Sequence, residues 1–422
     1  MKREQAEALD AVDPLAPLRE LFLLPDGLIY LDGNSLGALP RATAPRLQEV
    51  VTREWGEGLI GSWNTADWIS LPRRVGDKIA RLVGAGPGEV VVADSTSVNL
   101  YKVLASALAV AATERPDRRL VVSERSNFPT DLYVAAGLCR DRGYELVLVD
   151  APEEIPALLP QAAVAMITQV NYRTGHLHDL AALTRAAHDT GALTVWDLCH
   201  SAGALPVDLT AADADYAVGC GYKYLNGGPG APAYLWVHPR LADRFEQPIS
   251  GWMGHEAPFE MSPGYRPAAG VGRYLSGTPS VIGISALECG VDTLLAAEEV
   301  GGLAALRAKS LALTRLFAEL VEERLPGTFT LESPTEDERR GSQVCLSHPE
   351  GAFAIVQALI DRGVVGDFRA GDGAGSPDIL RFGVTPLYTR YVDVWDAVEQ
   401  LREVMASGEW REERFWQKGA VT

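Results

Sequence analysis

Seven short apolar runs, separated by segments with helical spacing, constrain the fold of this 422-residue chain more than any other feature. Most runs are rich in β-branched residues and apolar throughout, which is typical of strands covered on both faces. Helical spacing fills most of the gaps between them, for example from Leu100 to Ala112. The runs are Val90–Val92, Leu120–Val122, Leu146–Val149, Val164–Ile167, Leu193–Trp196, Tyr216–Val218 and Ala233–Val237. This alternation predicts an α/β domain built on a doubly wound, mostly parallel, seven-stranded sheet.

The two ends of the chain follow different patterns and predict a smaller α+β domain. After long helices between about 282 and 324, we expect strands at 328–331, 343–346 and 380–384 and helices at 353–362 and 392–405. At the start we expect a helix and connector, with a helical pattern that begins at Asp13-Pro14, then a strand at 28–31 and a helix at 41–60. We therefore assign residues 1–60 to a segment that contributes to the small domain, 61–300 to the large domain and 301–422 to the small C-terminal domain.

Composition argues against several classes of partner. The net charge of −18 disfavours nucleic acid and anionic membranes, because both require cationic patches. No apolar stretch reaches the roughly 18 residues of a membrane helix, and the first residues lack a signal-peptide pattern. The five cysteines are scattered without a C-x-x-C pair, which indicates free thiols in a reducing compartment. The sequence therefore predicts a cytoplasmic protein without a nucleic-acid or membrane partner.

Polar side chains follow the apolar runs, at the positions where ligands bind in doubly wound sheets. They comprise hydroxyls, an aromatic ring, acids, an imidazole and an amine: Thr96, Ser97, Phe128, Asp131, Thr168, Asp197, His200, Tyr222 and Lys223. Since the carboxyl ends of parallel strands meet at one edge of a sheet, we expect these groups to lie close together.

Lys223 lies between two tyrosines and precedes a glycine-rich turn, directly after a predicted buried strand. An unpaired buried ammonium is costly unless it loses its proton or forms a bond, so we interpret this lysine as an amine that condenses with a carbonyl. Asp197 is a carboxylate that can hold a heterocyclic nitrogen protonated. The two residues together predict pyridoxal phosphate as the cofactor.

Several of these residues also have a purely structural interpretation. Thr96 and Ser97 stand where a helix N-cap belongs, so capping and phosphate binding both remain open. Phe128 either stacks on a flat ring or acts as a hydrophobic staple. The lone Arg381 in an apolar strand suits a carboxylate ligand or a salt bridge to a nearby acid. Trp63 either anchors the packing of its loop or lines the site of an aromatic substrate.

Two loops favour the structural interpretation when read by themselves. The turn at 32–37, which contains Asn34, is better explained by backbone conformation than by a role in a site. His176 and His178 lie two residues apart, but no third ligand is evident, so we predict no metal site.

Motifs along nearly the whole chain resemble the kynureninase family, pyridoxal phosphate hydrolases of the aspartate aminotransferase fold type. They are Ser95-Thr96-Ser97-Val98-Asn99-Leu100, Asn127-Phe128-Pro129-Thr130-Asp131, Gln169-Val170-Asn171-Tyr172-Arg173-Thr174-Gly175, Asp197-Leu198-Cys199-His200-Ser201-Ala202-Gly203, Tyr222-Lys223-Tyr224-Leu225 and Thr385-Pro386-Leu387-Tyr388. A lysine and an aspartate on this fold indicate the cofactor alone, whereas the Phe-Pro-Thr-Asp and Tyr-Lys-Tyr-Leu contexts point to the family.

The resemblance implies a role for each candidate residue. Lys223 forms the Schiff base with the cofactor, Asp197 pairs with its pyridine nitrogen, and His200 supports that pair. The remaining cofactor contacts are Phe128 stacked on the ring, Asp131 beside it, Thr96, Ser97, Thr168 and Tyr222 on the phosphate and ring substituents, and Trp252 and Thr278 from the neighbouring subunit of a homodimer. Arg381 binds the substrate carboxylate, with Trp63 and Asn34 as further substrate contacts. We also interpret Tyr222 as a proton shuttle.

The implied reaction is hydrolytic cleavage of the Cβ–Cγ bond of L-kynurenine, or of its 3-hydroxy derivative, in tryptophan catabolism and NAD precursor synthesis. The products are anthranilate, or 3-hydroxyanthranilate, and L-alanine. The nearest alternative is a cysteine desulfurase or an aminotransferase of the same fold. A desulfurase needs a mobile catalytic cysteine, for which Cys345 is the candidate left open. A cofactor-fold protein used only for binding is disfavoured, because Asp197, His200, Tyr222 and Lys223 are all present.

Overall fold

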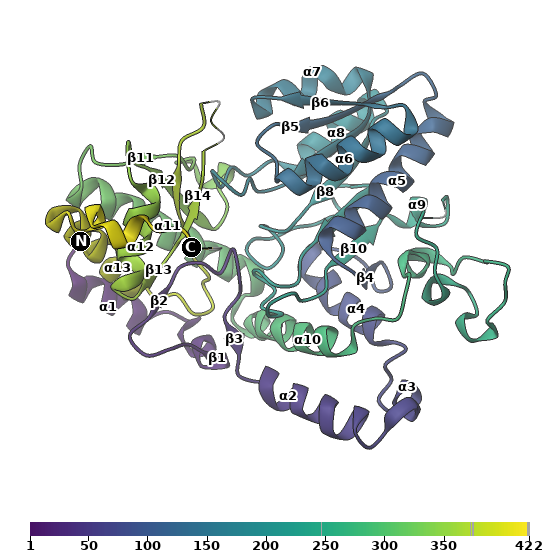
Figure 1. Cartoon of the computed structure of the whole chain (residues 1–422), viewed down its shortest axis with the longest axis horizontal. Coiled ribbons are helices and arrows are strands. Elements are labelled where there is room, and N and C mark those ends of the chain that lie inside the picture. The colour runs from purple at the N-terminus through teal and green to yellow at the C-terminus, as the bar shows by residue number, and fades with distance from the viewer. Residues whose placement is uncertain (246, 372, 374, 420–422) are drawn as a thin grey trace.

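The structure is a computed structural model that describes the 422-residue chain except residues 246, 372, 374 and 420–422. It has two lobes (Figure 1). One lobe surrounds a seven-stranded sheet, and the other, at the left of the figure, contains both ends of the chain.

Every apolar run named above forms a strand of the large sheet. The strands are β4 (Val90–Val92), β5 (Leu120–Glu124), β6 (Glu145–Val149), β7 (Ala162–Thr168), β8 (Leu193–Asp197), β9 (Tyr216–Gly219) and β10 (Tyr234–Val237), in the order β4-β10-β9-β8-β7-β5-β6. Only β10 runs antiparallel to its two neighbours. The predicted fold class, a mostly parallel seven-stranded α/β sheet, is confirmed.

Helices cover both faces of this sheet. Helices α4 (Leu71–Val83), α8 (Leu180–Thr190) and α10 (Val281–Leu295) bury side chains in one core, and α5 (Thr96–Glu114) and α6 (Pro129–Arg142) bury theirs in another. Within β4, Val90 and Val92 belong to the first core and Val91 to the second. This alternation explains why the strand is apolar throughout, since successive side chains point to opposite covered faces.

The small lobe holds a four-stranded antiparallel sheet with the order β11-β12-β15-β14. Its strands are β11 (Thr330–Leu331), β12 (Gln343–Ser347), β14 (Asp367–Arg369) and β15 (Ile379–Gly383), and its helices are α11 (Gly302–Arg324), α12 (Ala352–Asp361) and α13 (Tyr391–Ser407). Strand β13 (Val364–Val365) pairs in parallel with β2 (Ile29–Tyr30) from the N-terminal segment. We did not predict β14, a short strand that carries two charged residues.

The N-terminal segment differs from the prediction. The α-helix α1 (Arg3–Ala11) precedes Asp13-Pro14, and the stretch after it forms only a 3₁₀-helix, Ala16–Leu21. In an α-helix that began at Pro14, Pro17 would be the fourth residue and would lack the N–H that must donate to the carbonyl of Asp13. The predicted helix at 41–60 is divided into α2 (Thr43–Glu49), a π-helix (Val50–Trp55) and a 3₁₀-turn (Leu59–Gly61).

Helix α1 packs against α13, whereas α2 packs against α10. The N-terminal segment thus contacts both lobes, and the proposed domain boundaries at 60 and 300 stay a prediction. Short elements complete the chain: β1 (Phe22–Leu23), β3 (Leu39–Pro40), α3 (Ser62–Thr65), α7 (Ile155–Leu158), α9 (Pro239–Ala242) and 3₁₀-turns that include Trp252–Gly254 and Gly270–Tyr274. Among the described residues, no helix combines the length and apolar character needed to span a membrane.

A buried ion pair ties the N-terminal segment to the small lobe. Lys309 Nζ on α11 lies 2.7 Å from Asp13 Oδ2, and each side chain is only 6% exposed. The same ammonium donates to the carbonyl of Pro386 at 2.7 Å. Removing one partner of such a pair leaves an uncompensated charge in the protein interior.

We therefore expect Asp13→Ala to lower the free energy of unfolding by about 3 kcal/mol. Chemical denaturation of the purified protein measures this change. Arg53→Ala is the control, since its pair with Glu49 is exposed to solvent and should contribute less than about 1 kcal/mol. Equal effects of the two substitutions would contradict the role given to the buried pair.

Candidate functional site

A pocket lies at the carboxyl ends of the central parallel strands β7, β8 and β9, where doubly wound folds bind ligands. It is lined by hydroxyl, aromatic, acidic, imidazole and amine side chains from loops that are far apart in the sequence. These residues are Thr96, Ser97, Phe128, Thr130, Asp131, Thr168, Tyr172, Asp197, Cys199, His200, Tyr222 and Lys223. The structure thus brings together nine of the residues predicted from the sequence.

Lys223, in the loop after β9, is the amine of this pocket. Its Nζ lies 2.9 Å from His200 Nε2 and 5.8 Å from the centre of the Phe128 ring. His200 is buried, and its pKa is held well below the usual value because burial and then the Lys223 charge disfavour the imidazolium. The neutral imidazole can therefore accept a hydrogen bond from the lysine without carrying a second positive charge.

Two carboxyl groups lie in the floor of the pocket. Asp197 ends β8, where its Oδ1 accepts from the backbone N–H of Cys199 at 2.8 Å and its Oδ2 accepts from the hydroxyl of Thr168 at 3.4 Å. Asp131 is buried in the first turn of α6, and burial, followed by the nearby charge of Asp197, raises its pKa well above the ordinary value. Asp131 therefore holds a proton more readily than an exposed carboxyl group does.

The opposite end of the pocket suits an anion. Ser95 is the N-cap of α5, and its Oγ accepts from the N–H of Val98 at 3.4 Å. Thr96 and Ser97 are the first two helical residues, so the expectation that they themselves stand at the cap position is wrong by one residue. The free N–H groups and positive dipole of a 19-residue helix attract phosphate here.

Phe128 lines the pocket, and its side chain remains 40% exposed. The ring packs edge-on against Tyr172, with centroids 5.3 Å apart and an interplanar angle of 84°. Our candidate residues did not include Tyr172, although its position after β7 is the signal that identified the others. One open face of Phe128 can stack on a flat ligand.

These features fit pyridoxal phosphate. An amine, an anionic carboxylate, an exposed aromatic face and a helix N-terminus match the four parts of the cofactor that a protein must hold. In addition, Asp131 Oδ2 is buried without a hydrogen-bond partner among the described residues, and a bound ligand would satisfy it. Where the cofactor binds, Lys223, Asp197, Phe128, Thr96 and Ser97 would hold it.

Arg381 and Asn34 are buried beside this pocket rather than in its lining. Arg381, on β15, forms an ion pair with Asp367 on β14, so the salt bridge considered from the sequence exists. It also donates to Ser35 Oγ at 2.6 Å and to the carbonyl of Tyr172 at 2.9 Å. The Tyr172 contact links Arg381 directly to the residue that packs on Phe128.

Three candidates stand apart from the Lys223 pocket of the same chain. Trp63 and Trp252 pack on each other, with ring centroids 6.0 Å apart, and both contact Phe259. Thr278 is exposed. None of the three lines the pocket that contains Lys223.

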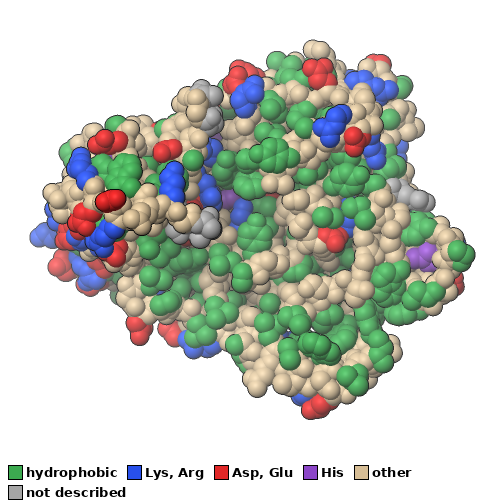
Figure 2. Space-filling view, viewed as in Figure 1, with side chains coloured by type: hydrophobic (Ala, Val, Ile, Leu, Met, Phe, Trp, Pro, Cys, Tyr) green, Lys and Arg blue, Asp and Glu red, His purple; other side chains and the backbone are tan. Residues whose placement is uncertain are grey.

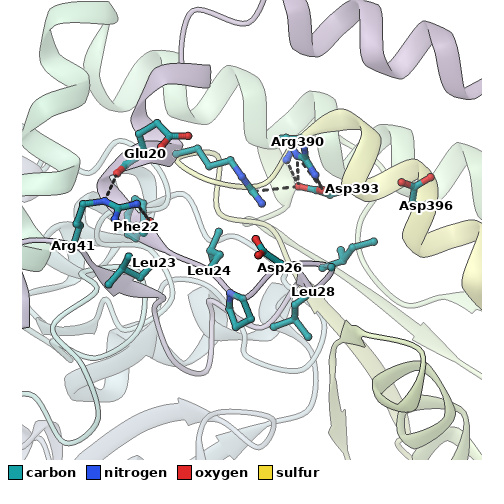
Figure 3. A pocket seen from close by; sticks show the side chains of 14 residues that line it. Glu20, Phe22, Leu23, Leu24, Asp26, Leu28, Arg41, Arg390, Asp393 and Asp396 are labelled. Carbon is teal, nitrogen blue, oxygen red and sulfur yellow. Dashed lines mark hydrogen bonds and ion pairs between the residues drawn. The ribbon is translucent and has the colours of Figure 1, made fainter.

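A larger hollow lies elsewhere, between residues 19–29 and the start of α13 (Figure 3). Its arginines already have partners: Arg390 pairs with Asp393 at 2.6 Å, Arg19 lies 3.4 Å from Asp393, and Arg41 donates to the carbonyls of Glu20 and Phe22. No candidate residue lines it, so size alone does not identify the functional site here.

Comparisons with known proteins agree with the geometry. The family model described as "Kynureninase C-terminal domain" matches residues 306–401. A kynureninase of Burkholderia pseudomallei (strain 1106a) is 56% identical over 424 residues, covering 100% of this chain and 99% of the relative. A kynureninase of Pseudomonas fluorescens is 54% identical with the same coverage.

Among solved structures, a cysteine desulfurase from Thermococcus onnurineus superposes with a TM-score of 0.78 over 93% of this chain and 98% of that chain. At 20% identity this likeness supports the fold alone. The full-length identity to the curated relatives is far higher and spans both lobes. The chain therefore belongs to the kynureninase family, pyridoxal phosphate-dependent hydrolases that act on a carbon–carbon bond.

Proposed function

We propose that this enzyme hydrolyses the Cβ–Cγ bond of L-kynurenine to give anthranilate and L-alanine, at sites shared between the two subunits of a homodimer. The observation that carries this proposal is the position of Lys223 Nζ, close to the neutral His200 imidazole and to the open face of Phe128. When bound, pyridoxal phosphate supplies an electron sink whose ring nitrogen must be protonated. The protein's own residues supply the proton transfers and the orientation.

Lys223 Nζ takes the proton from the α-carbon of the substrate. His200 supports this role, because its neutral imidazole orients the amine and does not repel it. Asp197 keeps the proton on the ring nitrogen. Its direction is set by the N–H of Cys199 and the hydroxyl of Thr168, both of which donate to the carboxylate.

Tyr222 is our candidate for returning a proton to the β-carbon of the product. Burial raises the pKa of its phenol far above the ordinary value, so the group stays protonated and can donate. Arg381 is our candidate for the substrate carboxylate, because its guanidinium lies beside the pocket and reaches the Tyr172 backbone. One water molecule adds to the γ-ketone: its oxygen ends in the carboxylate of anthranilate, and one of its hydrogens balances the proton that the β-carbon of alanine gains.

A desulfurase is the main competing function on this fold, and the cysteines argue against it. All five are free and buried. Cys345, the candidate left open by the sequence, is fully buried in β12, between β11 and β15 of the small sheet. A catalytic cysteine that must reach the substrate on a mobile loop would need an exposed, flexible position.

The direct test mixes the cofactor-loaded enzyme with L-kynurenine and follows anthranilate fluorescence and alanine. We expect both products, and we expect Lys223→Ala to lower the rate by at least about a thousandfold and to remove the visible absorbance of the lysine-linked cofactor. Lys78→Ala is a matched control, since Lys78 pairs with Asp292 outside the pocket. An unchanged spectrum in Lys223→Ala would refute the lysine assignment, and absence of both products from the loaded enzyme would favour an aminotransferase or desulfurase.

Exposed apolar residues near α2 and α3 support the homodimer. Trp55, Leu59 and Ile60 are more than half exposed, and Ile60 reaches 81%. Figure 2 shows hydrophobic side chains over this lower part of the molecule. A second copy would cover this surface and would bring Trp252 and Thr278, which do not line their own chain's pocket, to the site of its partner.

Hybrid dimers test this arrangement. Subunits that carry Lys223→Ala are mixed and exchanged with subunits that carry Trp252→Ala. If Trp252 serves the partner's site, each hybrid has one intact site, and a 1:1 mixture should regain about a quarter of native activity. Light scattering should first show a species of twice the 45.4 kDa chain mass. If the mixture of such dimers is no more active than the mean of the two single variants, the shared site is contradicted.

A further inference from the structure

Gln343 is a buried polar residue that neither the reaction nor the fold explains. It begins β12 of the small sheet, pairs with Gly383 of β15, and is only 1% exposed. A buried glutamine without hydrogen bonds would destabilise the folded state, so its hydrogen-bond partners indicate its role.

The Nε2 of Gln343 lies 3.4 Å from Cys345 Sγ in the same strand, but two of its partners are backbone carbonyls of the large lobe. Gln343 Nε2 donates to the carbonyl of Tyr172 at 3.1 Å and lies 3.4 Å from the carbonyl of Asn171. The loop fits closely around the side chain: Gly175 adopts a φ of +74°, and a Cβ at that position would lie 3.0 Å from Gln343 Cγ. The amide therefore fixes the backbone of the 171–175 loop against the small sheet.

The carbonyl of Tyr172 has a second donor, Arg381 Nη1, at 2.9 Å. Gln343 and Arg381 thus share one acceptor, and the position of that oxygen depends on both. Asn34 lies between the same two residues: one terminal atom of its amide is 3.2 Å from both Gln343 Oε1 and Arg381 Nε, and it bonds the first as a donor or the second as an acceptor. The shared Tyr172 carbonyl is therefore the hydrogen-bonded link from Gln343 to the guanidinium of Arg381.

We propose that Gln343 is a positioning residue for substrate binding: it fixes the Tyr172 carbonyl, and through that shared acceptor it aims Arg381 at the substrate carboxylate. The proposal rests on the role given to Arg381 under the proposed function. Substrate affinity then depends on hydrogen bonds between the two lobes, because Gln343 and Arg381 lie in the small sheet and Tyr172 lies in a loop of the large lobe.

Gln343→Met is the informative variant, because it keeps the length of the side chain and removes the amide. We expect KM for L-kynurenine to rise about tenfold or more, with kcat changed by less than about threefold. The visible absorbance of the lysine-linked cofactor should persist, because the substitution leaves Lys223 itself in place.

Gln357→Met is the matched control. Gln357 lies on α12 in the same lobe, and its Nε2 has no hydrogen-bond partner among the described residues. The same chemical change there should leave KM unchanged. If Gln343→Met lowers the melting temperature without changing KM, the residue is only structural and the proposal is wrong.

A double-mutant cycle with Arg381→Lys separates this proposal from the function on which it rests. If Gln343 acts through Arg381, the KM effects of the two substitutions should be clearly less than multiplicative when combined. Multiplicative effects would overturn the positioning role and leave Arg381 as the carboxylate ligand. An unchanged KM in Arg381→Lys alone would instead remove the carboxylate assignment.

Discussion

The close contact between Lys223 and His200 is the interaction on which the rest of the site depends. An amine and an imidazole 2.9 Å apart in a buried pocket are compatible only if they do not both carry a charge. Burial meets this condition by lowering the pKa of His200. The same desolvation, followed by the charge of Asp197, raises the pKa of Asp131. Burial thus favours the neutral forms of two groups that line the pocket.

The parallel sheet is what brings these groups together. Thr168 and Asp197 are directly paired at the ends of β7 and β8, and the loop after β9 supplies Lys223. Residues on neighbouring strand ends need no special interaction to meet, because the register of the sheet sets their separation. The helix N-terminus of α5 adds the anion-binding end of the pocket. The chemistry therefore follows from the topology of the large lobe.

This dependence explains how much the sequence could predict. The seven strands of the large sheet and the convergence of Lys223, Asp197 and Phe128 follow from local patterns, because strand ends of a parallel sheet share one edge. The role of Gln343 does not, because the carbonyls of Asn171 and Tyr172 that it contacts lie about 170 residues away in another lobe. The short strand β14 and its Asp367 were missed for a similar reason, since a three-residue strand with two charges is defined by the pairing with β15 and not by apolar periodicity. In the N-terminal segment, the absence of a donor at Pro17 prevented the expected α-helix after Asp13.

The central claim is that Asp197 is the acid that makes the cofactor an effective electron sink, and Asp197→Asn tests it most directly. The measurement is exchange of the α-proton of L-alanine with solvent deuterium, followed by NMR in the cofactor-loaded protein. We expect exchange in Asp197→Asn to slow by at least about a hundredfold while the lysine-linked cofactor stays bound, because the amide cannot stabilise the protonated ring nitrogen. Exchange within a few-fold of the native rate would contradict this role of Asp197.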